Sequence, residues 1–392
     1  MISYPLEGVK VVDLTQYVAG PYCTQVLADL GASVLKVERP GGDVYRRQGP
    51  VFVEGESVSF LALNRGKQSV VLDLADEADR KRLFEFLEDA DVLVENMRPR
   101  ALARFGLDYP SLADRFPRLV YCSISAFGSD GPLAGSGGYD LTVQALSGLM
   151  AMTGQPGGPP AKIPIAAIDF GGALYGALGI LAALRQRDAT GRGQHVESSL
   201  LGCALAWLSM HIVTYLYTGD EPKPLGTRSP FFAPYEAYRT KDGYLVVVGT
   251  GGTDSWGDLC RELGLERLLD DPRFATNSDR VREAEALQAE LESVFTTDDT
   301  DRWVERLTAA GVPSAPVQQL GEVLESEQVA ALGLLDELAH PRAGRIPIVR
   351  LPLSMSDAKV TADQAPPLLG GDSGEERTGA SREVGRKLDG QS

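Results

Sequence analysis

The stretch VKVVDLTQYVAGPYCTQVLADLGASVLKVE, residues 9–38, decides the fold of this chain. Its β-branched run at 10–14 predicts a strand, 21–30 has the apolar spacing of a helix, and 33–38 predicts a second strand. A strand, a helix and a strand in this order form a right-handed crossover between parallel strands. The same alternation continues with strands at 69–74, 91–95 and 119–123 and a helix at 77–87. We therefore expect an α/β fold of Rossmann-like architecture, with a parallel sheet between helices.

The first turn of this unit argues against a dinucleotide site. Glu38 ends the second strand, about where a dinucleotide-binding fold places its ribose-binding acid. The loop before the helix, however, reads TQYVAGP, with one glycine instead of G-x-G-x-x-G. Close approach of the backbone to a pyrophosphate needs those glycines, so the NAD interpretation is weak.

Length and composition describe an ordinary globular protein. The chain has 392 residues, enough for two domains, and is 43% hydrophobic and 23% charged. A net charge of −16 disfavours nucleic acid as a partner, because the overall field repels phosphates. The start, MISYPLEGVKVVDL, lacks a signal-peptide pattern, and the four cysteines form no C-x-x-C pair. We expect a cytoplasmic protein with reduced core cysteines, no metal site and no membrane partner.

The composition changes near residue 218. The proline-rich run at 218–234 is typical of a linker, and 235–249 predicts a hairpin that turns at Lys241-Asp242-Gly243. Charged helices are expected at about 254–310, and the tail beyond 365 is rich in Gly, Glu and Arg. The expected organisation is a large domain at 1–200, a helix and linker at 201–234, a small domain at 235–320 and a return segment at 321–392.

Two stretches could contact an anionic ligand. Arg98, Arg100 and Arg104 follow the strand at 91–95, and ligands of open α/β sheets bind at the carboxyl ends of strands. Arginine forks match phosphate oxygens, but a solvated helix start with surface arginines explains the pattern equally well. The glycine stretch GTGGT at 249–253 could close over a site, although a plain strand-to-helix turn is the simpler interpretation.

The apolar run at 163–184 contains one charged residue, Asp169. Its Gly and Ala content favours a buried helix over a membrane span, with Gly172 and Gly176 allowing a neighbouring element to approach closely. The stretch 200–217 predicts a second buried helix. Asp169 could be a simple helix N-cap. It could equally be a half-buried, ionised carboxylate that acts as a nucleophile. Spacing alone does not decide between these roles.

Several motifs in order resemble the class III coenzyme A transferase family. They are PLEGVKVVDLTQYVAGPYCTQVLADLGASVLKVERPGGD, NRGKQSVVLDL, DVLVENMRPRALARFGLDY, GGYDLTVQALSG, IDFGGALYGALGILAAL, TGRGQHVESSL and GVPSAPV. The resemblance covers nearly the whole chain and implies that Asp169 is the nucleophile. It would attack the thioester of an acyl-CoA to give a mixed anhydride and then an aspartyl-CoA thioester. Coenzyme A and acyl-CoA are then substrates, and no tightly bound cofactor is implied.

The resemblance also implies further site residues, namely Val18 and Ala19 in the first loop, Arg39 at the adenine, Leu72 in the adenosine pocket, Asn96, Arg98 and Arg104 at the coenzyme, Tyr139 beside the nucleophile, and Gly251 and Gly252 in a loop that covers it. The implied architecture is a large domain built from both chain ends, an inserted smaller α+β domain and an interlocked homodimer.

Departures from the family pattern bear on the substrate. Formyl-CoA transferases have a glutamine where Val18 stands, and a longer glycine run than GTGGT. A larger acyl donor such as succinyl-CoA, with a dicarboxylate or branched acid as acceptor, therefore fits better. The family also contains α-methylacyl-CoA racemases, whose catalytic histidine would fall at Tyr139, a poor base with a pKa near 10. A racemase is thus a second interpretation, and a non-catalytic binder of coenzyme A or a dinucleotide is a third.

Overall fold

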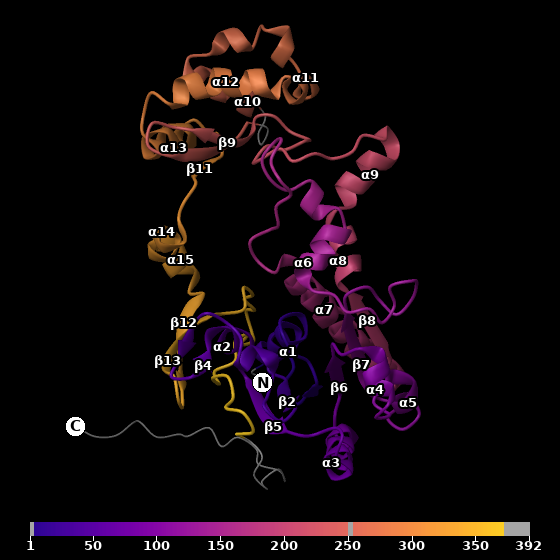
Figure 1. Cartoon of the computed structure of the whole chain (residues 1–392). Coiled ribbons are helices and arrows are strands. Elements are labelled where there is room, and N and C mark those ends of the chain that lie inside the picture. The colour runs from indigo at the N-terminus through magenta and orange to yellow at the C-terminus, as the bar shows by residue number, and fades with distance from the viewer. Residues whose placement is uncertain (1–3, 250–253, 372–392) are drawn as a thin grey trace, which may run out of the picture. The chain divides into compact units, whose positions relative to one another are not determined.

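The computed structural model describes residues 4–249 and 254–371. The chain forms two compact units, each assembled from separate segments (Figure 1). Unit 1 comprises Met1–Gly137, Asp169–Leu200 and Asp336–Ser392, and unit 2 comprises Gly138–Ile168 and Leu201–Leu335. Residues 138–168, which the sequence places in the large domain, thus group with unit 2. The predicted domain bounds remain a prediction, because this grouping reflects contacts and not independent folding.

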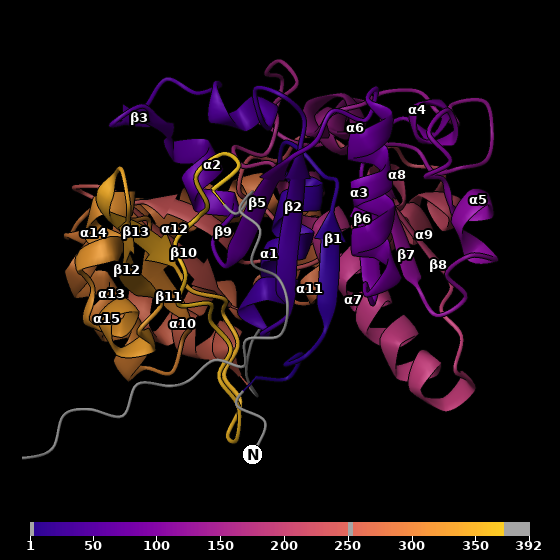
Figure 2. The same cartoon turned by 90° about the horizontal axis from the view of Figure 1, so that it is seen from below.

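Unit 1 is built on a six-stranded sheet whose pairings are all parallel. The strand order is β5-β2-β1-β6-β7-β8 (Figure 2). The strands are β1 (Lys10–Asp13), β2 (Ser33–Glu38), β5 (Lys67–Val71), β6 (Val92–Glu95), β7 (Val120–Ser125) and β8 (His195–Ser199). Successive strands run outward from β1 on one side and from β6 on the other, so the order reverses between these two. The predicted parallel α/β sheet is confirmed, and its switch point is where such sheets bind ligands.

The helices of unit 1 cover this sheet. They are α1 (Ala19–Asp29), α2 (Val58–Leu63), α3 (Glu77–Glu88), α4 (Pro99–Ala103), α5 (Tyr109–Ala113) and the long α7, whose range Ala167–Thr190 begins two residues before the unit does. Short two-stranded sheets add β3 (Phe52–Val53) to β4 (Glu56–Ser57) and β12 (Leu335–His340) to β13 (Gly344–Val349).

The small residues of α7 allow the close packing that the sequence predicts. A Cβ added at Gly172 would lie 2.6 Å from a methyl of Leu200, and one at Gly179 would lie 2.5 Å from a methyl of Val196. At Gly176 it would lie 3.1 Å from Ile124 of β7. One face of α7 is therefore in direct contact with the sheet, as in a core helix, although among the described residues α7 alone has the length and apolarity to cross a membrane as a single straight helix.

The predicted buried helix is buried on the face of α7 that contacts the sheet, whereas its other face is exposed in the single chain. Leu174, Tyr175 and Leu178 are 47%, 42% and 61% exposed. The second predicted buried helix, at 200–217, is wrong in two respects. It is two helices, α8 (Leu200–Trp207) and α9 (Ser209–Thr218), bent by 65° at their junction. In addition, α9 has no buried residue, because its apolar side chains face outward in the single chain.

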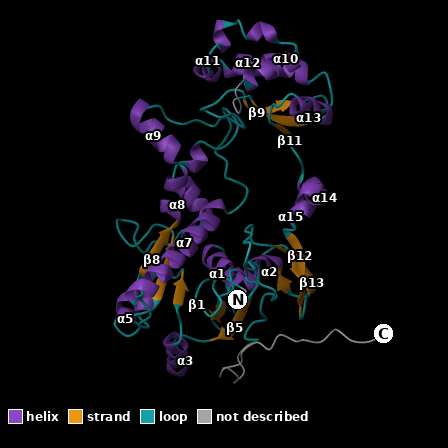
Figure 3. Ribbon diagram, turned by 180° about the vertical axis from the view of Figure 1, so that it is seen from behind, coloured by secondary structure: helices purple, strands orange, loops and turns teal. Residues whose placement is uncertain are grey.

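Unit 2 contains the predicted hairpin. Strands β9 (Tyr235–Arg239) and β10 (Tyr244–Val248) pair antiparallel, and β11 (Ser314–Pro316) joins β10. Charged helices follow as predicted, and their apolar faces form one core with the hairpin (Figure 3). They are α10 (Ser255–Leu263), α11 (Asn277–Arg282), α12 (Ala284–Phe295) and α13 (Thr300–Ala309). Unit 2 also holds α6 (Asp140–Leu146), α14 (Leu320–Glu325) and α15 (Glu327–Leu332).

Candidate active site

Asp169 is the third residue of α7 and not its N-cap, because the helix begins at Ala167. Its half-buried side chain lies in the first turn, where the positive end of the helix dipole stabilises a negative charge. The segment that leads into the helix is held within unit 2. The Asp140 carboxylate accepts from Ile168 N at 2.8 Å, and Gln144 Oε1 accepts from Ile163 N at 3.0 Å. The sequence predictions did not include Asp140 and Gln144 as functional residues.

Aromatic side chains of unit 1 lie close to Asp169 and Phe170 in the first turn of α7. Phe170, directly after Asp169, packs edge-on against Tyr22 of α1 with ring centroids 4.7 Å apart. Just before α1, Tyr17 packs edge-on against Tyr45, with ring centroids 5.7 Å apart. Burial raises the pKa of Tyr45, and the negative charges of Asp169 and Asp43 raise it further. Tyr45 is thus a protonated hydroxyl in the electrostatic field of the candidate nucleophile.

A cavity of about 220 Å³ lies in unit 1 at the carboxyl ends of β1, β2, β5 and β6. It brings together two of the predicted coenzyme-binding residues, Arg39 and Leu72. Arg39 follows β2 and is exposed, whereas Leu72 follows β5 and is buried. The other lining residues are Leu14, Thr15, Gln16, Val37, Glu38, Gly42, Asp43, Asp73, Leu74, Ala75, Met97 and Phe105. Apolar walls with an arginine at the rim suit a flat heteroaromatic ring that carries phosphates.

The residues after β6 that the sequence predicts at the coenzyme lie next to this cavity, because Met97 and Phe105 line it. Asn96 holds the loop between β1 and α1 through two bonds to the backbone of Gln16. Its amide donates to Gln16 O at 2.7 Å, and its Oδ1 accepts from Gln16 N at 3.0 Å. Arg98 and Arg104 flank α4 and are both exposed. The guanidinium of Arg104 lies 5.8 Å from the ring centroid of Phe105, which lines the cavity. The arginines therefore stand near the cavity, while their contact with a ligand remains a prediction.

The remaining predicted residues lie in different parts of the chain. Val18 and Ala19 are both buried at the start of α1. Tyr139 belongs to unit 2, where it precedes α6 with 61% of its surface exposed. Gly251 and Gly252 lie outside the described residues.

Glu38 is engaged in a way that excludes the ribose-binding role. Arg46 donates to both of its carboxylate oxygens at 2.7 Å, Ser69 Oγ donates at 2.6 Å, and Asp43 N donates at 2.8 Å. These donors, with Arg46 first among them, outweigh burial and lower the pKa of the Glu38 carboxyl. A carboxylate so fully bonded has little capacity left for a sugar hydroxyl. The structure thus adds to the argument against a dinucleotide.

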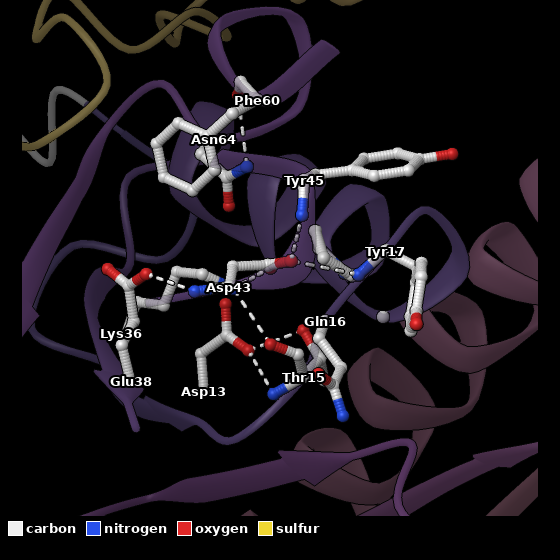
Figure 4. Close-up of polar contacts among 12 residues, drawn as sticks. Asp13, Thr15, Gln16, Tyr17, Lys36, Glu38, Asp43, Tyr45, Phe60 and Asn64 are labelled. Carbon is white, nitrogen blue, oxygen red and sulfur yellow. Dashed lines mark hydrogen bonds and ion pairs between the residues drawn. The ribbon is translucent and has the colours of Figure 1, made fainter. Parts of the chain in front are cut away.

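A buried charge network adjoins the cavity, since its member Asp43 contributes to the cavity wall, and Figure 4 shows the part of the network around Asp13, Lys36 and Asp43. Lys36 Nζ is 2.9 Å from Asp43 and 2.8 Å from Thr15 O, and Lys67 Nζ is 3.1 Å from Asp13. Burial raises the pKa of Asp13, but Lys67, Lys36 and two hydroxyls outweigh it and bring the pKa to about 2. Burial lowers the pKa of Lys67 to about 8. Sequence reasoning missed this network because its members lie on separate strands and loops.

Comparison with known proteins agrees with these features. The family model described as CoA-transferase family III matches residues 6–373. The chain belongs to CoA-transferase family III. It is therefore an enzyme that transfers coenzyme A.

The relatives of this transferase include enzymes named for specific acids. It is 38% identical over 367 residues to a human succinyl-CoA:glutarate CoA-transferase, covering 93% of this chain and 84% of the relative. It is 39% identical over 333 residues to the acetyl-CoA:oxalate CoA-transferase of Acetobacter aceti, covering 84% of this chain and 85% of that one. A solved CAIB/BAIF family protein from Brucella suis superposes with a TM-score of 0.83 at 38% identity, covering 95% and 98% of the two chains.

Proposed function

We propose that this transferase works through covalent intermediates on Asp169. The carboxylate attacks the thioester carbonyl of the donor, the C–S bond breaks, and an acyl-aspartyl anhydride and CoA thiolate result. The thiolate attacks the aspartyl carbonyl and displaces the donor acid, which leaves an aspartyl-CoA thioester. An acceptor carboxylate then attacks this thioester and releases the thiolate. The thiolate finally attacks the acceptor's acyl carbon and restores Asp169.

The position of Asp169 in the first turn of α7 carries this proposal. No step of the exchange needs a proton, so a carboxylate nucleophile suffices and no general base is required. The positive end of the α7 dipole favours both this carboxylate and a developing oxyanion. The aromatic neighbours Phe170, Tyr22 and Tyr45 help to exclude water, which would hydrolyse the anhydride.

The acids exchanged are proposed to be dicarboxylic acids, with succinyl-CoA as a donor. Relatives named for succinyl-CoA:glutarate and succinyl-CoA:mesaconate exchange support this class. The sequence departures at Val18 and in the 249–253 loop agree, since both differ from the formyl-CoA transferase pattern. We place the adenosine in the cavity that contains Arg39 and Leu72, with Asn96, Arg98 and Arg104 along the rest of the coenzyme.

We further propose a homodimer of interlocked chains, acting in the cytoplasm, with the small domain inserted into the large one as predicted. The support is the apolar surface that each unit leaves exposed. In unit 1 it includes Leu174 and Leu178, and in unit 2 it includes Trp207, Leu216 and Tyr217, which are 49%, 74% and 88% exposed. Large apolar side chains exposed on helices in this way are typical of interaction sites. Light scattering at micromolar concentration tests this, and a monomer of 42.0 kDa would contradict it.

Isotope exchange tests the chemistry directly. The enzyme is mixed with succinyl-CoA and carbon-13-labelled glutarate, and mass spectrometry follows labelled glutaryl-CoA. Asp169→Ala should abolish the exchange, whereas Asp188→Ala, an exposed aspartate in the last turns of the same helix, should not. Hydroxylamine added during turnover should leave a hydroxamate on the peptide that contains Asp169. Full exchange by Asp169→Ala would refute the proposed nucleophile.

The racemase interpretation has its own readout. A 2-methylacyl-CoA labelled with deuterium at the α-carbon would lose its label if the enzyme moved that proton. Tyr139 is the residue at the position of the racemase histidine, and a neutral phenol is a weak base at neutral pH. Label loss without any exchange between acids would favour this alternative over the transferase.

A further inference from the structure

The Asp43 side chain contacts two parts of unit 1. It lines the 220 Å³ cavity, and it bonds to the backbone of Tyr17 and Tyr45. It is 4% exposed, and it lies in the loop between β2 and the short 3-10 turn Val44–Arg46. One carboxylate oxygen accepts from two backbone groups, Tyr45 N at 3.0 Å and Tyr17 N at 3.3 Å. The other lies 2.9 Å from the ammonium of Lys36.

The backbone of Tyr17 needs this support. Its φ of 69° lies in the left-handed region, which a bulky L-residue rarely adopts. Such a conformation costs about 1–3 kcal/mol and persists only where the surroundings hold it. The loop around it is held on both sides, by Asp43 at Tyr17 N and by Asn96 at Gln16. The strained backbone of Tyr17 is held by the buried Asp43 carboxylate, and a strained residue that is held in this way points to a functional role for the loop.

The two bonds of Asp43 also place two aromatic rings. Tyr17 and Tyr45 pack edge-on with centroids 5.7 Å apart, and Figure 4 shows both rings on the same side of Asp43. The chain continues from Tyr17 into α1, where Tyr22 contacts Phe170, the residue after Asp169. The Tyr17–Tyr45 pair therefore stands at the end of α1 that faces the start of α7.

We propose that Asp43 is a positioning residue that links occupancy of the adenosine cavity to the placement of Tyr17 and Tyr45 beside Asp169. This inference rests on the proposed function. A ligand that fills the cavity presses against the loop at Gly42 and Asp43 and restricts its movement. The restriction passes through the two amide bonds to the tyrosines. Binding energy from the nucleotide half of the substrate then contributes to the rate at the thioester and not only to affinity.

An isosteric amide cannot replace the carboxylate here. Asp43 faces donors on both sides, two backbone N–H groups on one and the Lys36 ammonium on the other. In Asp43→Asn the NH₂ group must point at one of these sides, where it meets another donor. The loop is then expected to shift, and a misplacement of about 1 Å near reacting atoms reduces rates about 100-fold.

Truncated substrates test the link. Succinyl-pantetheine carries the same thioester as succinyl-CoA but lacks the adenosine half. In the wild type, kcat with succinyl-CoA should exceed kcat with succinyl-pantetheine about 100-fold. In Asp43→Asn we expect kcat with succinyl-CoA to fall about 100-fold, while kcat with succinyl-pantetheine falls less than about threefold. The advantage of the nucleotide should thus largely disappear.

Asp29→Asn is the matched control. Asp29 is also buried in unit 1 and also has a cationic partner, since Arg65 Nε donates to it at 2.9 Å, but it is not among the residues that line the cavity. Its kcat ratio for the two thioesters should equal that of the wild type.

Three outcomes decide between the ideas. An Asp43→Asn enzyme with the wild-type ratio overturns the positioning role while leaving the proposed function intact. Equal kcat values for both thioesters in the wild type overturn it as well, and this comparison stands even where the variant does not fold. A wild type that transfers neither coenzyme A from succinyl-CoA nor pantetheine from succinyl-pantetheine to an acceptor acid refutes the proposed function, and the inference with it.

Discussion

Replacing Glu95 by Gln should make the protein more stable at pH 8 while changing little at pH 5. Glu95 ends β6 with 5% of its surface exposed. Burial raises the pKa of its carboxyl from the ordinary value of 4.5 to about 7, against bonds from Ser123 and from Met97 N, and Glu197 raises it further. Between pH 4.5 and 7 the folded state therefore binds a proton that the unfolded state releases. Stability from this group is lost as the pH rises through that window.

The size of the effect follows from the two pKa values. A tenfold change in proton affinity is worth about 1.4 kcal/mol, so the difference between 4.5 and about 7 corresponds to about 3 kcal/mol at pH 8. A glutamine stays neutral at every pH, and its carbonyl can still accept the 2.8 Å bond from Met97 N. Glu95→Gln should consequently exceed the wild type by up to about 3 kcal/mol at pH 8.

Urea unfolding at pH 5 and pH 8 measures this difference. It should be followed by circular dichroism, because Trp207, Trp256 and Trp303 all lie in unit 2 and Glu95 lies in unit 1. Other titrating groups act in both proteins and cancel in the comparison. Glu88→Gln, an exposed change in the same unit, should show no pH-dependent difference beyond a few tenths of a kcal/mol. Equal stability differences at the two pH values would refute the reasoning.

Three further changes test the framework of unit 1. Gly193→Ala places a Cβ 2.0 Å from the Leu119 carbonyl oxygen, so the backbones must separate, and thermal unfolding should show a loss of about 1–3 kcal/mol. Arg46→Met leaves the Glu38 carboxylate buried without its cation and should cost about 3–5 kcal/mol in urea, with Glu38→Gln in the same chain restoring part of it. The Asp13 carboxyl has its pKa lowered from 3.8 to about 2, so its stabilisation of about 2 kcal/mol is present above pH 4 and is lost as the pH falls toward 2. In Asp13→Asn the free energy of unfolding should fall less steeply between pH 4 and pH 2 than in the wild type. The same slope in both proteins would contradict the lowered pKa of Asp13.

The sheet was predictable because short-range patterns determine it. The strand predicted at 33–38 has the observed bounds of β2, and those at 10–14 and 91–95 differ by one residue. Prediction failed where tertiary contacts override local preference. The strand β8, with the sequence HVESS, is short and polar and was not foreseen, although it pairs with five residues of β7. The bend between α8 and α9 was also missed, since neither glycine nor proline marks it.

In the candidate site, too, residues within sequence motifs could be predicted, whereas residues whose role depends on tertiary contacts could not. Asp169 and the residues predicted to contact the coenzyme were proposed from motifs, and the structure brings two of them, Arg39 and Leu72, into one cavity. Asp43 could not be found in this way, because a carboxylate after two glycines looks like an ordinary loop acid. Its importance depends on Lys36 and Tyr17, which lie on other elements. Lys36 itself sits in an apolar strand and is fully buried, so alternation along the sequence gives no sign of its partner.

The edge strand β5 and the residue before it bond to a segment that lies about 300 residues later in the chain. Gly66 N donates to Gln364 O, and Gly370 N donates to Ser69 Oγ across 301 residues. At roughly 5–20 residues per second, a ribosome needs about 15–60 seconds to synthesise that interval. Until then these two bonds cannot form. The region around β5 therefore reaches its final contacts only after residues 364–370 have been synthesised.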